Sequence, residues 1–341
     1  MSGSEIIIKD MLDLHHRQIN YIRLSITDKC NLQCIYCKPS RNLRQLERSQ
    51  ILSYEEILRL IRVAVGCGIT KVRLTGGDPL VRRDVVSLLR SISQLDGVKD
   101  ISLTTNGVLL EQMAAGLYEA GLHRINISLD SLNREKYRKI TCQDRLDQVW
   151  QGIKTASEIG FSPIKINTVV IKGINDDEIL NLARLSLTYP FHIRFIEFMP
   201  IGNHQLWQEK KFFSCLKIQK IITAYRPLIP STSTGHRHSL GDGPAQLFEF
   251  EGAPGKIGFI SPMSDHFCST CNRIRLTADG KLRSCLFSSQ EMDIKAIMRS
   301  GGSDEDLRQL FIKAIENKPV GLDYSQFSAV KCSRFMNSIG G

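Results

Sequence analysis

Short apolar runs alternate with amphipathic stretches of helix length from about residue 20 to about residue 200. The runs with the character of strands are residues 21–26, 71–74, 100–103, 124–129, 164–170 and 192–196. The stretches with helical periodicity are residues 54–65, 85–93, 109–120, 146–159 and 177–187. This alternation predicts parallel strands joined by right-handed crossovers. About six such units form either an open doubly wound sheet or a partial barrel.

Most of these strands have one polar face. Apolar Ile22 and Leu24, for example, alternate with polar Arg23 and Ser25. Parallel strands covered by helices on both faces are almost continuously apolar, so the pattern favours a barrel whose interior holds a polar ligand. The basic residues of this face predict an anionic ligand, and they are Arg23, Lys71, Arg73, Lys165 and Arg194. The alternative is a sheet with an exposed antiparallel face.

The pattern changes after about residue 225. Residues 226–245 contain two prolines, a Ser/Thr run and Gly-Asp-Gly-Pro, and we expect them to form a linker. Residues 247–250 and 256–260 are expected to form a hairpin, followed by helices near residues 291–299 and 304–317, and residues 336–341 have no strong preference. We therefore predict an α/β fold in three parts: a partial TIM-type β/α barrel (1–225), the linker (226–245) and a C-terminal α+β extension (246–341).

Composition limits the class of protein. The chain has 341 residues, of which 42% are hydrophobic and 23% charged, which excludes disorder, collagen and coiled coil as the main architecture. No apolar run approaches the ~20 residues that span a bilayer, and residues 1–10 lack the features of a signal or transit peptide. We expect a cytoplasmic protein. The net charge of +10 suits a polyanionic partner, which is a nucleic acid, a membrane surface or a phosphate-rich small molecule.

Ten cysteines in a long chain without an export signal predict metal or redox chemistry rather than disulfides. Six of the ten lie in two tight groups. Buried packing is the expected role of the other four, which are Cys67, Cys142, Cys215 and Cys332.

The first group consists of Cys30, Cys34 and Cys37, in the spacing Cys-x3-Cys-x2-Cys directly after the first expected strand. Iron–sulfur clusters are usually held by four thiolates. Three thiolates leave one iron open for a ligand that is not protein, as a catalytic zinc site keeps an open position. The alternative is a zinc knuckle with a histidine ligand, but the loop contains no histidine and the nearest before it is His16.

This spacing, with Tyr36 just before the third cysteine, resembles the signature of radical S-adenosylmethionine (SAM) enzymes. The resemblance implies that the open iron chelates the methionine moiety of SAM, and that an electron from the cluster releases a 5′-deoxyadenosyl radical. Residues 76–79, 104–107, 128–131 and 197–200 also resemble family segments, and they follow expected strands, where barrel active sites are built. Residue 78 is Asp where the family usually has Glu.

The second group consists of Cys268, Cys271 and Cys285, again three potential ligands. Between the last two, Arg273 and Arg275 alternate on an extended segment, so both point to one side. Arginine suits bidentate recognition of phosphate. This arrangement favours a second iron–sulfur cluster beside a phosphate-bearing ligand.

Three alternatives stay open for the second group. One is a zinc site completed by His266, and another is a fourth thiolate from Cys332. The third is that Arg273 and Arg275 lie on a strand face that is exposed to solvent.

The chain has two three-cysteine motifs, the segment Asn-Arg-Ile-Arg-Leu-Thr at residues 272–277, and a Gly-Gly terminus. In these features it resembles the GTP 3′,8-cyclase family, and the resemblance covers essentially the whole chain. Relatives usually have Met-Pro where this chain has Lys38-Pro39. That family catalyses the first step of molybdenum cofactor biosynthesis. The resemblance implies that the radical removes the ribose 3′ hydrogen of GTP, and that C3′ bonds to guanine C8 to form (8S)-3′,8-cyclo-7,8-dihydroguanosine 5′-triphosphate.

The resemblance also assigns residues. The first cysteine group would hold the [4Fe–4S] cluster that cleaves SAM, and the second a [4Fe–4S] cluster whose open iron binds guanine. The implied SAM contacts are Tyr36, Gly77, Ser128 and Met199. The implied GTP contacts are Arg23, Arg73, Thr104, Lys165, Arg194, Arg273, Ile274 and Arg275. The implied catalytic residues are Arg273, Arg275, Gly340 and Gly341, where the alternative for the two glycines is terminal fraying.

The partners implied are GTP, a flavodoxin- or ferredoxin-type electron donor, and a cyclic pyranopterin monophosphate synthase that uses the product. We also expect a homodimer and neither a nucleic-acid nor a membrane partner. One rival is a radical SAM protein with an auxiliary cluster that modifies a peptide. The other is a non-catalytic zinc protein that binds nucleic acid, which the net charge of +10 suggests.

Overall fold

The structure is a computed structural model. It describes residues 12–37, 45–201, 206–231, 243–321 and 334–340. These residues form two compact units. The first unit contains the described residues of segments 1–29, 44–101 and 268–341, and the second contains those of segments 30–43 and 102–267.

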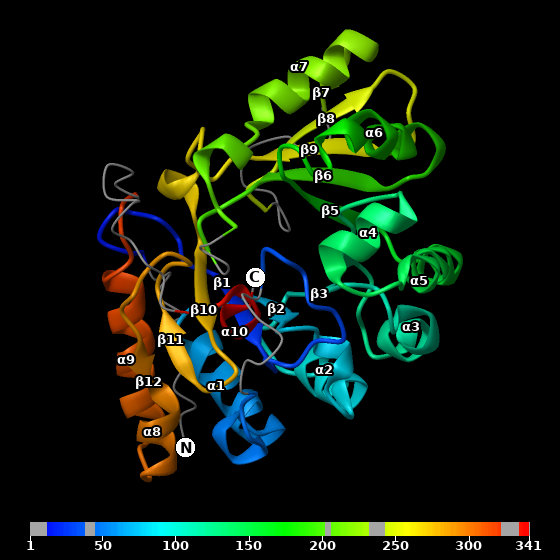
Figure 1. Ribbon diagram of the computed structural model, residues 1–341. Coiled ribbons are helices and arrows are strands. Elements are labelled where there is room, and N and C mark those ends of the chain that lie inside the picture. Colours follow the sequence, from blue (N-terminus) through cyan, green and yellow to red (C-terminus); the bar gives the residue numbers. More distant parts are fainter. Residues whose placement is uncertain (1–11, 38–44, 202–205, 232–242, 322–333, 341) are drawn as a thin grey trace. The chain divides into compact units, whose positions relative to one another are not determined.

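The elements follow one another along the chain as Figure 1 labels them. The strands are β1 (Tyr21–Ser25), β2 (Lys71–Thr75), β3 (Asp100–Thr105), β4 (Ile125–Ser128), β5 (Ile164–Val170), β6 (His192–Glu197), β7 (Leu228–Pro230), β8 (Gln246–Phe250), β9 (Lys256–Ile260), β10 (Arg273–Leu276), β11 (Lys281–Arg283) and β12 (Met292–Asp293). The α-helices are α1 (Tyr54–Gly66), α2 (Val85–Ser93), α3 (Leu110–Glu119), α4 (Arg134–Thr141), α5 (Leu146–Ile159), α6 (Ile179–Thr188), α7 (Cys215–Tyr225), α8 (Ile294–Arg299), α9 (Asp304–Glu316) and α10 (Met336–Ile339). Short 3-10 helices are η1 (Arg48–Gln50), η2 (Pro79–Val81), η3 (Asp176–Glu178), η4 (Glu209–Lys211) and η5 (Cys268–Thr270).

In the first unit, β10, β1 and β2 pair in parallel, and β11 and β12 extend the sheet beyond β10 in antiparallel pairing (Figure 1). Helix α9 packs against α1, α8 and β11, and α8 also packs against β11. α1 begins at a capping box on Ser53, and α9 begins at one on Ser303. Each box satisfies amide groups that the first helical turn leaves unpaired. The apolar faces are buried, as at Leu60 of α1 and Phe311 of α9.

In the second unit, β3, β4, β5, β6 and β9 pair in parallel in that order. The strands β8 and β7 continue from β9 in antiparallel pairing (Figure 1). Helices α3 and α4 pack on α5, and α6 packs on α7 and β6. The strand positions that face the helices are fully buried, as at Ile127 and Ile166.

The predicted alternation of strands and helices is confirmed within each unit. All six predicted strands are present as β1 to β6, and the predicted hairpin is present as β8 and β9. The five predicted helices are α1, α2, α3, α5 and α6, and the two C-terminal ones are α8 and α9. Of the described residues, none belongs to a helix that is long and apolar enough to cross a membrane.

Three of the five basic residues on the polar strand faces are buried, and Arg23 and Arg73 are half-buried. Lys71, Lys165 and Arg194 expose only 8%, 6% and 4% of their surface. Their strands pair in parallel, so the alternative of an exposed antiparallel face is wrong. Burial of a cation without an anionic partner is costly, and the buried bases therefore fit a fold that encloses an anion.

Several elements were not predicted. Helices α4 and α7 fall between the predicted ones, and α10 forms at residues 336–339, where no preference was expected. β7 lies within the predicted linker, where Leu228 pairs with Phe250. Residues 232–242 of that linker lie outside the described residues.

The predicted three-part division of the chain stays a prediction, but the compact units divide the chain differently. β10 pairs with β1, which groups the segment after residue 268 with the N-terminal strands. β9 pairs with β6, which groups the hairpin with the second unit. Strand pairing over long sequence separation sets these groupings, and local composition does not report it.

Candidate active site

The first thiol site lies in the second unit and consists of Cys30, Cys34 and Cys37. Its backbone is held at the end of α4. The Gln33 amide donates to the Thr141 carbonyl at 3.0 Å, and the Ile35 amide donates to the Ile140 carbonyl at 2.9 Å. A helix that the sequence pattern did not predict therefore sets the position of these cysteines.

The three thiols act on one another's ionisation. Burial, then the Asp130 carboxyl, and then the thiols of Cys37 and Cys30 raise the pKa of Cys34 well above its ordinary value. The Tyr36 hydroxyl donates to Asp130 at 2.6 Å, and burial raises the pKa of Asp130 to about 6. Three thiolates at this place therefore need a positively charged partner, such as the iron of a cluster.

Hydrogen-bond donors also face this site. The Leu32 amide lies 3.4 Å and the Asn106 Nδ2 atom 3.5 Å from the Cys30 sulfur, and such donors tune iron–sulfur clusters. Within the described segments, no three His, Cys, Asp or Glu side chains surround a single-ion position. The described residues therefore give no support to a zinc knuckle at this site.

The expected SAM contacts are distributed over both units. Gly77 belongs to the first unit, and the second contains Tyr36, Ser128 and Met199. The Gly77 amide donates to the Thr27 carbonyl at 2.7 Å, and a Cβ atom at Gly77 would lie 2.2 Å from the Lys29 carbonyl oxygen. Only glycine fits this turn, which presents bare backbone after β2.

Two acidic side chains at strand ends have structural partners. Asp78 is buried and accepts a bond from the Leu80 amide at 2.9 Å, so it caps η2. Glu197 is fully buried, and it accepts bonds from the amides of Cys215 and Met263, both at 2.9 Å. These carboxylates hold the loops that follow β2 and β6.

The second thiol site lies in the first unit and consists of Cys268, Cys271 and Cys285. Burial alone would raise the pKa of Cys271, but the charges of Arg273 and Lys318 lower it to about 6. The Arg273 Nη2 atom lies 3.5 Å from the Cys271 sulfur. For Cys268, burial and then the other two thiols raise the pKa, so the three sulfurs share one region. Thiolates stabilised by neighbouring cations fit the ligands of an iron–sulfur cluster.

Of the alternatives for this site, a fourth thiolate from Cys332 stays untested. The Nδ1 atom of His266 lies 2.8 Å from the Pro262 carbonyl oxygen, and the described residues contain no three-ligand group around one ion position. Cys332 lies outside the described residues. Arg275 is 5% exposed and does not lie on a solvated face, whereas Arg273 is half-buried.

Three arginines form a row on adjacent parallel strands, and we call Arg275, Arg23 and Arg73 the arginine row. Their Cα atoms pair directly across β10, β1 and β2. Like charges on directly opposite positions of a sheet repel. Burial, then Arg275, Arg73 and Arg273 hold the pKa of Arg23 well below its ordinary value. Burial and then Arg273 lower the pKa of Arg275 to about 10. A polyanion would relieve this repulsion.

Ile274, between the two arginines of β10, is fully buried. Its side chain therefore packs into the core on the opposite face from its neighbours. Ile274 therefore contacts a ligand only through its backbone, or acts indirectly by holding its strand in place.

A second polar row crosses the second unit. Thr104, Asn126, Lys165 and His192 are successive Cα partners across β3, β4, β5 and β6. In the next register, Arg194 pairs with Asn167. The Thr104 hydroxyl, the Asn126 Oδ1 atom and the His192 Nδ1 atom are buried and have no hydrogen-bond partner within the described part of the chain. Such orphaned groups fit a polar ligand that completes their bonds.

The C-terminal tail reaches the arginine row. Arg275 Nη1 donates to the Gly340 carbonyl at 2.7 Å. Gly340 has a φ of 71°, and a Cβ atom there would lie 2.3 Å from Thr75 Oγ1, so the position requires glycine. This placement differs from terminal fraying. Gly341 lies outside the described residues.

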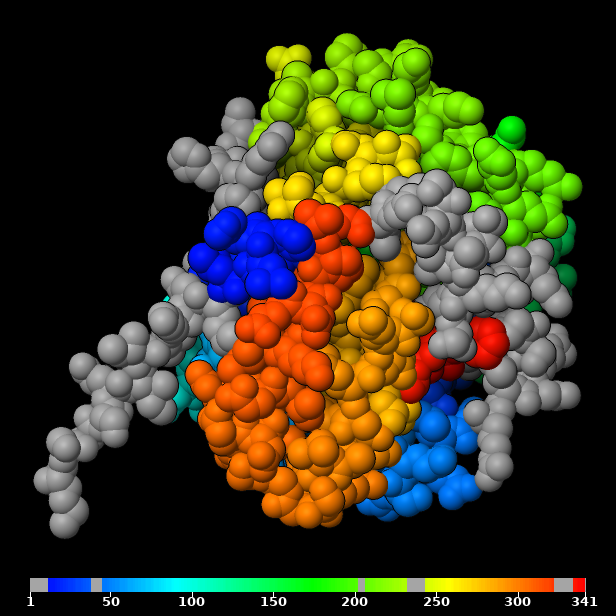
Figure 2. All heavy atoms as spheres, turned by 90° about the vertical axis from the view of Figure 1, so that its left-hand side faces the viewer, coloured from blue at the N-terminus to red at the C-terminus, as the bar shows by residue number. Residues whose placement is uncertain are grey.

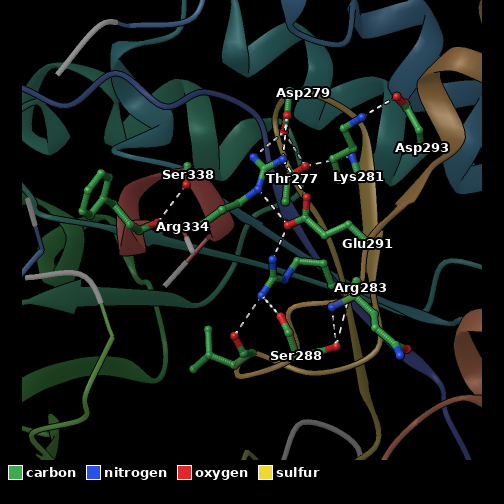
Figure 3. Close-up of polar contacts among 12 residues, drawn as sticks. Thr277, Asp279, Lys281, Arg283, Ser288, Glu291, Asp293, Arg334 and Ser338 are labelled. Carbon is green, nitrogen blue, oxygen red and sulfur yellow. Dashed lines mark hydrogen bonds and ion pairs between the residues drawn. The ribbon is translucent and has the colours of Figure 1, made fainter. Parts of the chain in front are cut away.

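A polar network fixes this tail (Figure 3). Arg334 donates to both oxygens of Asp279, at 3.0 and 2.9 Å, and to Glu291 at 2.8 Å. Glu291 also pairs with Arg283, which is fully buried. The Arg334 fork therefore ties the start of the tail to the β10–β11 turn and to the segment before β12.

The sequence interpretation missed several residues of these sites. Asp130 lies in the segment 128–131, which resembles a family segment, but it had no assigned role. Its contact with Tyr36 forms only in the folded chain. Asn126 and His192 showed a signal, because they continue the polar alternation of β4 and β6. Lys318 and Arg17, which contact the second thiol site, had no periodic signal.

Family models match the chain in two parts. A model described as Radical SAM superfamily matches residues 24–186. A model described as Molybdenum Cofactor Synthesis C matches residues 191–324.

Solved structures support the fold. The Streptococcus suis SuiB structure bound to S-adenosylmethionine is similar with a TM-score of 0.61 at 14% identity, and the match covers 82% of this chain and 64% of that chain. SuiB bound to its precursor peptide SuiA gives 0.60 at 15% identity, over 90% and 67%. Together with the parallel strand–helix units, these matches confirm the predicted partial β/α barrel class.

Curated relatives are similar over nearly the full length. A GTP 3′,8-cyclase from Syntrophomonas wolfei is 47% identical over 97% of this chain and 100% of the relative. One from Thermodesulfovibrio yellowstonii is 48% identical over the same shares. The three-cysteine sites, the arginine row and the buried tail glycine lie on a chain with this degree of similarity, and the chain therefore belongs to the GTP 3′,8-cyclase family of the radical SAM superfamily.

Proposed function

We propose that the protein converts GTP to (8S)-3′,8-cyclo-7,8-dihydroguanosine 5′-triphosphate, the first step of molybdenum cofactor biosynthesis. Its relatives are named for this activity. As a radical SAM protein, it uses SAM and an iron–sulfur cluster. The single observation that carries the proposal is the arginine row, which shares its buried region with the second thiol site through Arg273.

The first thiol site is proposed to hold the [4Fe–4S] cluster that acts on SAM. When bound, the reduced cluster and SAM supply a 5′-deoxyadenosyl radical, which removes a hydrogen atom from the substrate. The protein's part is to hold three sulfurs in a turn that is bonded to the end of α4. Proposed SAM contacts are Tyr36, Gly77, Ser128 and Met199. Tyr36 is oriented by its bond to Asp130, and Gly77 offers backbone without a side chain.

The second thiol site is proposed to hold a second [4Fe–4S] cluster, whose open position binds the guanine of GTP. Three sulfurs with cations around them support this assignment. The proposed GTP contacts of the first unit are Arg23, Arg73, Arg273, Ile274 and Arg275. Those of the second unit are Thr104, Lys165 and Arg194. The arginines offset the charge of the triphosphate, and the binding of GTP in turn relieves their mutual repulsion.

Arg273, Arg275 and the Gly340–Gly341 tail are proposed to act at the reacting nucleotide. Arg275 holds the Gly340 carbonyl, so the tail and the arginine row respond to the same ligand. A buried, closed site limits side reactions of a radical. Further proposals are a flavodoxin- or ferredoxin-type electron donor, a downstream cyclic pyranopterin monophosphate synthase, and a homodimer.

The test uses GTP with deuterium at ribose C3′, incubated anaerobically with the protein, SAM and a reductant. The expected result is deuterium in the released 5′-deoxyadenosine, together with one cyclised nucleotide for each SAM consumed. Formation of 5′-deoxyadenosine without deuterium, with GTP unchanged, would overturn the proposal. It would leave the peptide-modifying class of radical SAM enzyme as the better candidate.

A further inference from the structure

The second thiol site is built from separate backbone segments with little regular structure. Cys268 begins η5, Cys271 precedes β10, and Cys285 follows β11. One backbone bond, from the Cys271 amide to the Cys268 carbonyl at 3.2 Å, joins the first two. A cluster requires its ligand sulfurs at fixed separations, so other groups must hold these segments together.

Lys318 joins two of the segments. It follows α9, and it is only 3% exposed. Its Nζ atom donates to the Arg273 carbonyl at 2.7 Å and to the Ser284 carbonyl at 2.9 Å. Arg273 is two residues after Cys271 and Ser284 directly precedes Cys285, so one ammonium group ties both cysteine segments to the end of α9.

Arg17 connects the remaining segment, which contains Cys268, to the same end of α9. Its Nη1 atom donates to the Cys268 carbonyl at 2.7 Å, and Nη2 donates to the carbonyls of Lys318 and Pro319 at 3.1 and 2.9 Å. Its Nε atom donates to Asp13 at 2.6 Å. The planar guanidinium fork makes all of these bonds at once, which an ammonium group does not. Figure 2 shows the blue N-terminal segment lying against the orange atoms at the end of α9.

The charges of this pair are unbalanced. Arg17 and Lys318 are both buried; Asp13 pairs with Arg17, and within the described residues no ion pair joins Lys318 to a carboxylate. One buried positive charge is thus left over, which is costly without a nearby anion. Deprotonated cysteine ligands supply that anion.

We propose that Arg17 and Lys318 are positioning residues of the second thiol site: they hold its three cysteine segments together by their carbonyl oxygens and offset part of the negative charge of a bound cluster. This inference rests on the proposed second cluster. Groups that orient metal ligands typically contribute about 10- to 100-fold to metal retention. Loss of Lys318 removes two bonds and one charge, whereas Arg17→Lys keeps the charge and loses the fork.

The test uses the full chain with Cys30, Cys34 and Cys37 all changed to Ala, which leaves the second thiol site alone. The readouts are iron per chain after anaerobic reconstitution, the rate of iron loss to a chelator, and the electron paramagnetic resonance spectrum of the reduced protein. Lys318→Met and Arg17→Lys are each introduced into this background. The matched control is Lys313→Met, on the exposed side of the same α9.

We expect Lys318→Met to lose iron about 10 to 100 times faster and to change the spectrum, and Arg17→Lys to have a smaller effect. Lys313→Met should leave both readouts unchanged. The circular dichroism of the apoprotein shows whether a variant folds, and Arg17→Lys keeps the test valid if Lys318→Met does not.

Two failures are distinguishable. If the second thiol site alone binds no iron, the proposed second cluster is wrong. If it binds iron and folded Lys318 and Arg17 variants lose that iron no faster than the Lys313 control, the positioning role is wrong.

Discussion

The two thiol sites use three cysteines each in opposite electrostatic surroundings. At the first, the buried Asp130 carboxyl helps to raise the pKa of Cys34. At the second, Arg273 and Lys318 lower the pKa of Cys271 to about 6. Positive surroundings stabilise the more reduced state of a cluster and attract an anionic ligand. Two groups of three cysteines can therefore serve different chemistry, and we propose that the first site suits the zwitterionic end of SAM and the second a nucleotide triphosphate.

The largest effect should come from Arg273→Ala, which removes a cation that lies 3.5 Å from the Cys271 sulfur. A charge-assisted bond contributes about 1.5–3 kcal/mol, so GTP conversion should fall roughly 10- to 100-fold. SAM cleavage, measured as 5′-deoxyadenosine released, depends on the first site and should change far less. Equal loss of both activities in the same assay would remove the division of roles between the two sites.

A smaller effect is expected from Arg334→Met, because this arginine holds the tail and touches neither thiol site. Loss of its bonds to Asp279 and Glu291 should destabilise the observed position of the tail by about 1.4 kcal/mol, which lowers GTP conversion roughly tenfold. Iron content should stay unchanged. The control is Arg308→Met, an exposed arginine on α9 that pairs with Glu305. If the two variants have equal activity, the tail network does not serve the reaction.

The smallest effect concerns the cationic region around His192 in the second unit. Burial and then Arg194, Lys165 and Lys256 lower the pKa of His192 to about 3. The unfolded chain binds the proton below pH about 6.5, whereas the folded protein keeps His192 neutral. The free energy of unfolding should therefore fall as the pH drops from 6.5 toward 3.

Between pH 7.5 and 5.5 the loss attributable to His192 should be about 1 kcal/mol. Urea denaturation of the apoprotein measures it, with His192→Gln as the comparison. The variant should lose less stability than the unchanged protein over this interval. The same loss in both would mean that His192 is not held neutral.

Much of the fold was predictable because it follows from the local periodicity of apolar residues in the sequence. The apolar alternation of β1 to β6 and the helical faces between them identify the strand–helix units. Helix α4 was missed because its segment is dominated by charged residues, and Tyr137 and Ile140 alone carry its buried apolar face. Pairing of β10 with β1 joins residues about 250 positions apart, and no local pattern reports such a contact.

The candidate site was predictable to a similar extent. Cysteine spacing and alternating arginines identify both thiol sites and the arginine row. Arg17 and Lys318 were not identified as contacts of the second thiol site. Each donates hydrogen bonds to backbone carbonyls of residues that are distant in the sequence, and no local pattern reports such bonds. Asp279, in the turn between β10 and β11, and Glu291, just before β12, become partners of Arg334 only in the folded chain.

The central claim is that two distinct clusters serve two different ligands. Its most direct test is the electron paramagnetic resonance spectrum, with iron and zinc content, of two anaerobically prepared full-length variants. One has Cys268, Cys271 and Cys285 changed to Ala, and the other has Cys30, Cys34 and Cys37 changed to Ala. We predict about four irons in each, a spectrum that responds to SAM alone in the first variant, and one that responds to GTP alone in the second. Zinc in place of iron in either variant, or a response of both spectra to the same ligand, would contradict the claim.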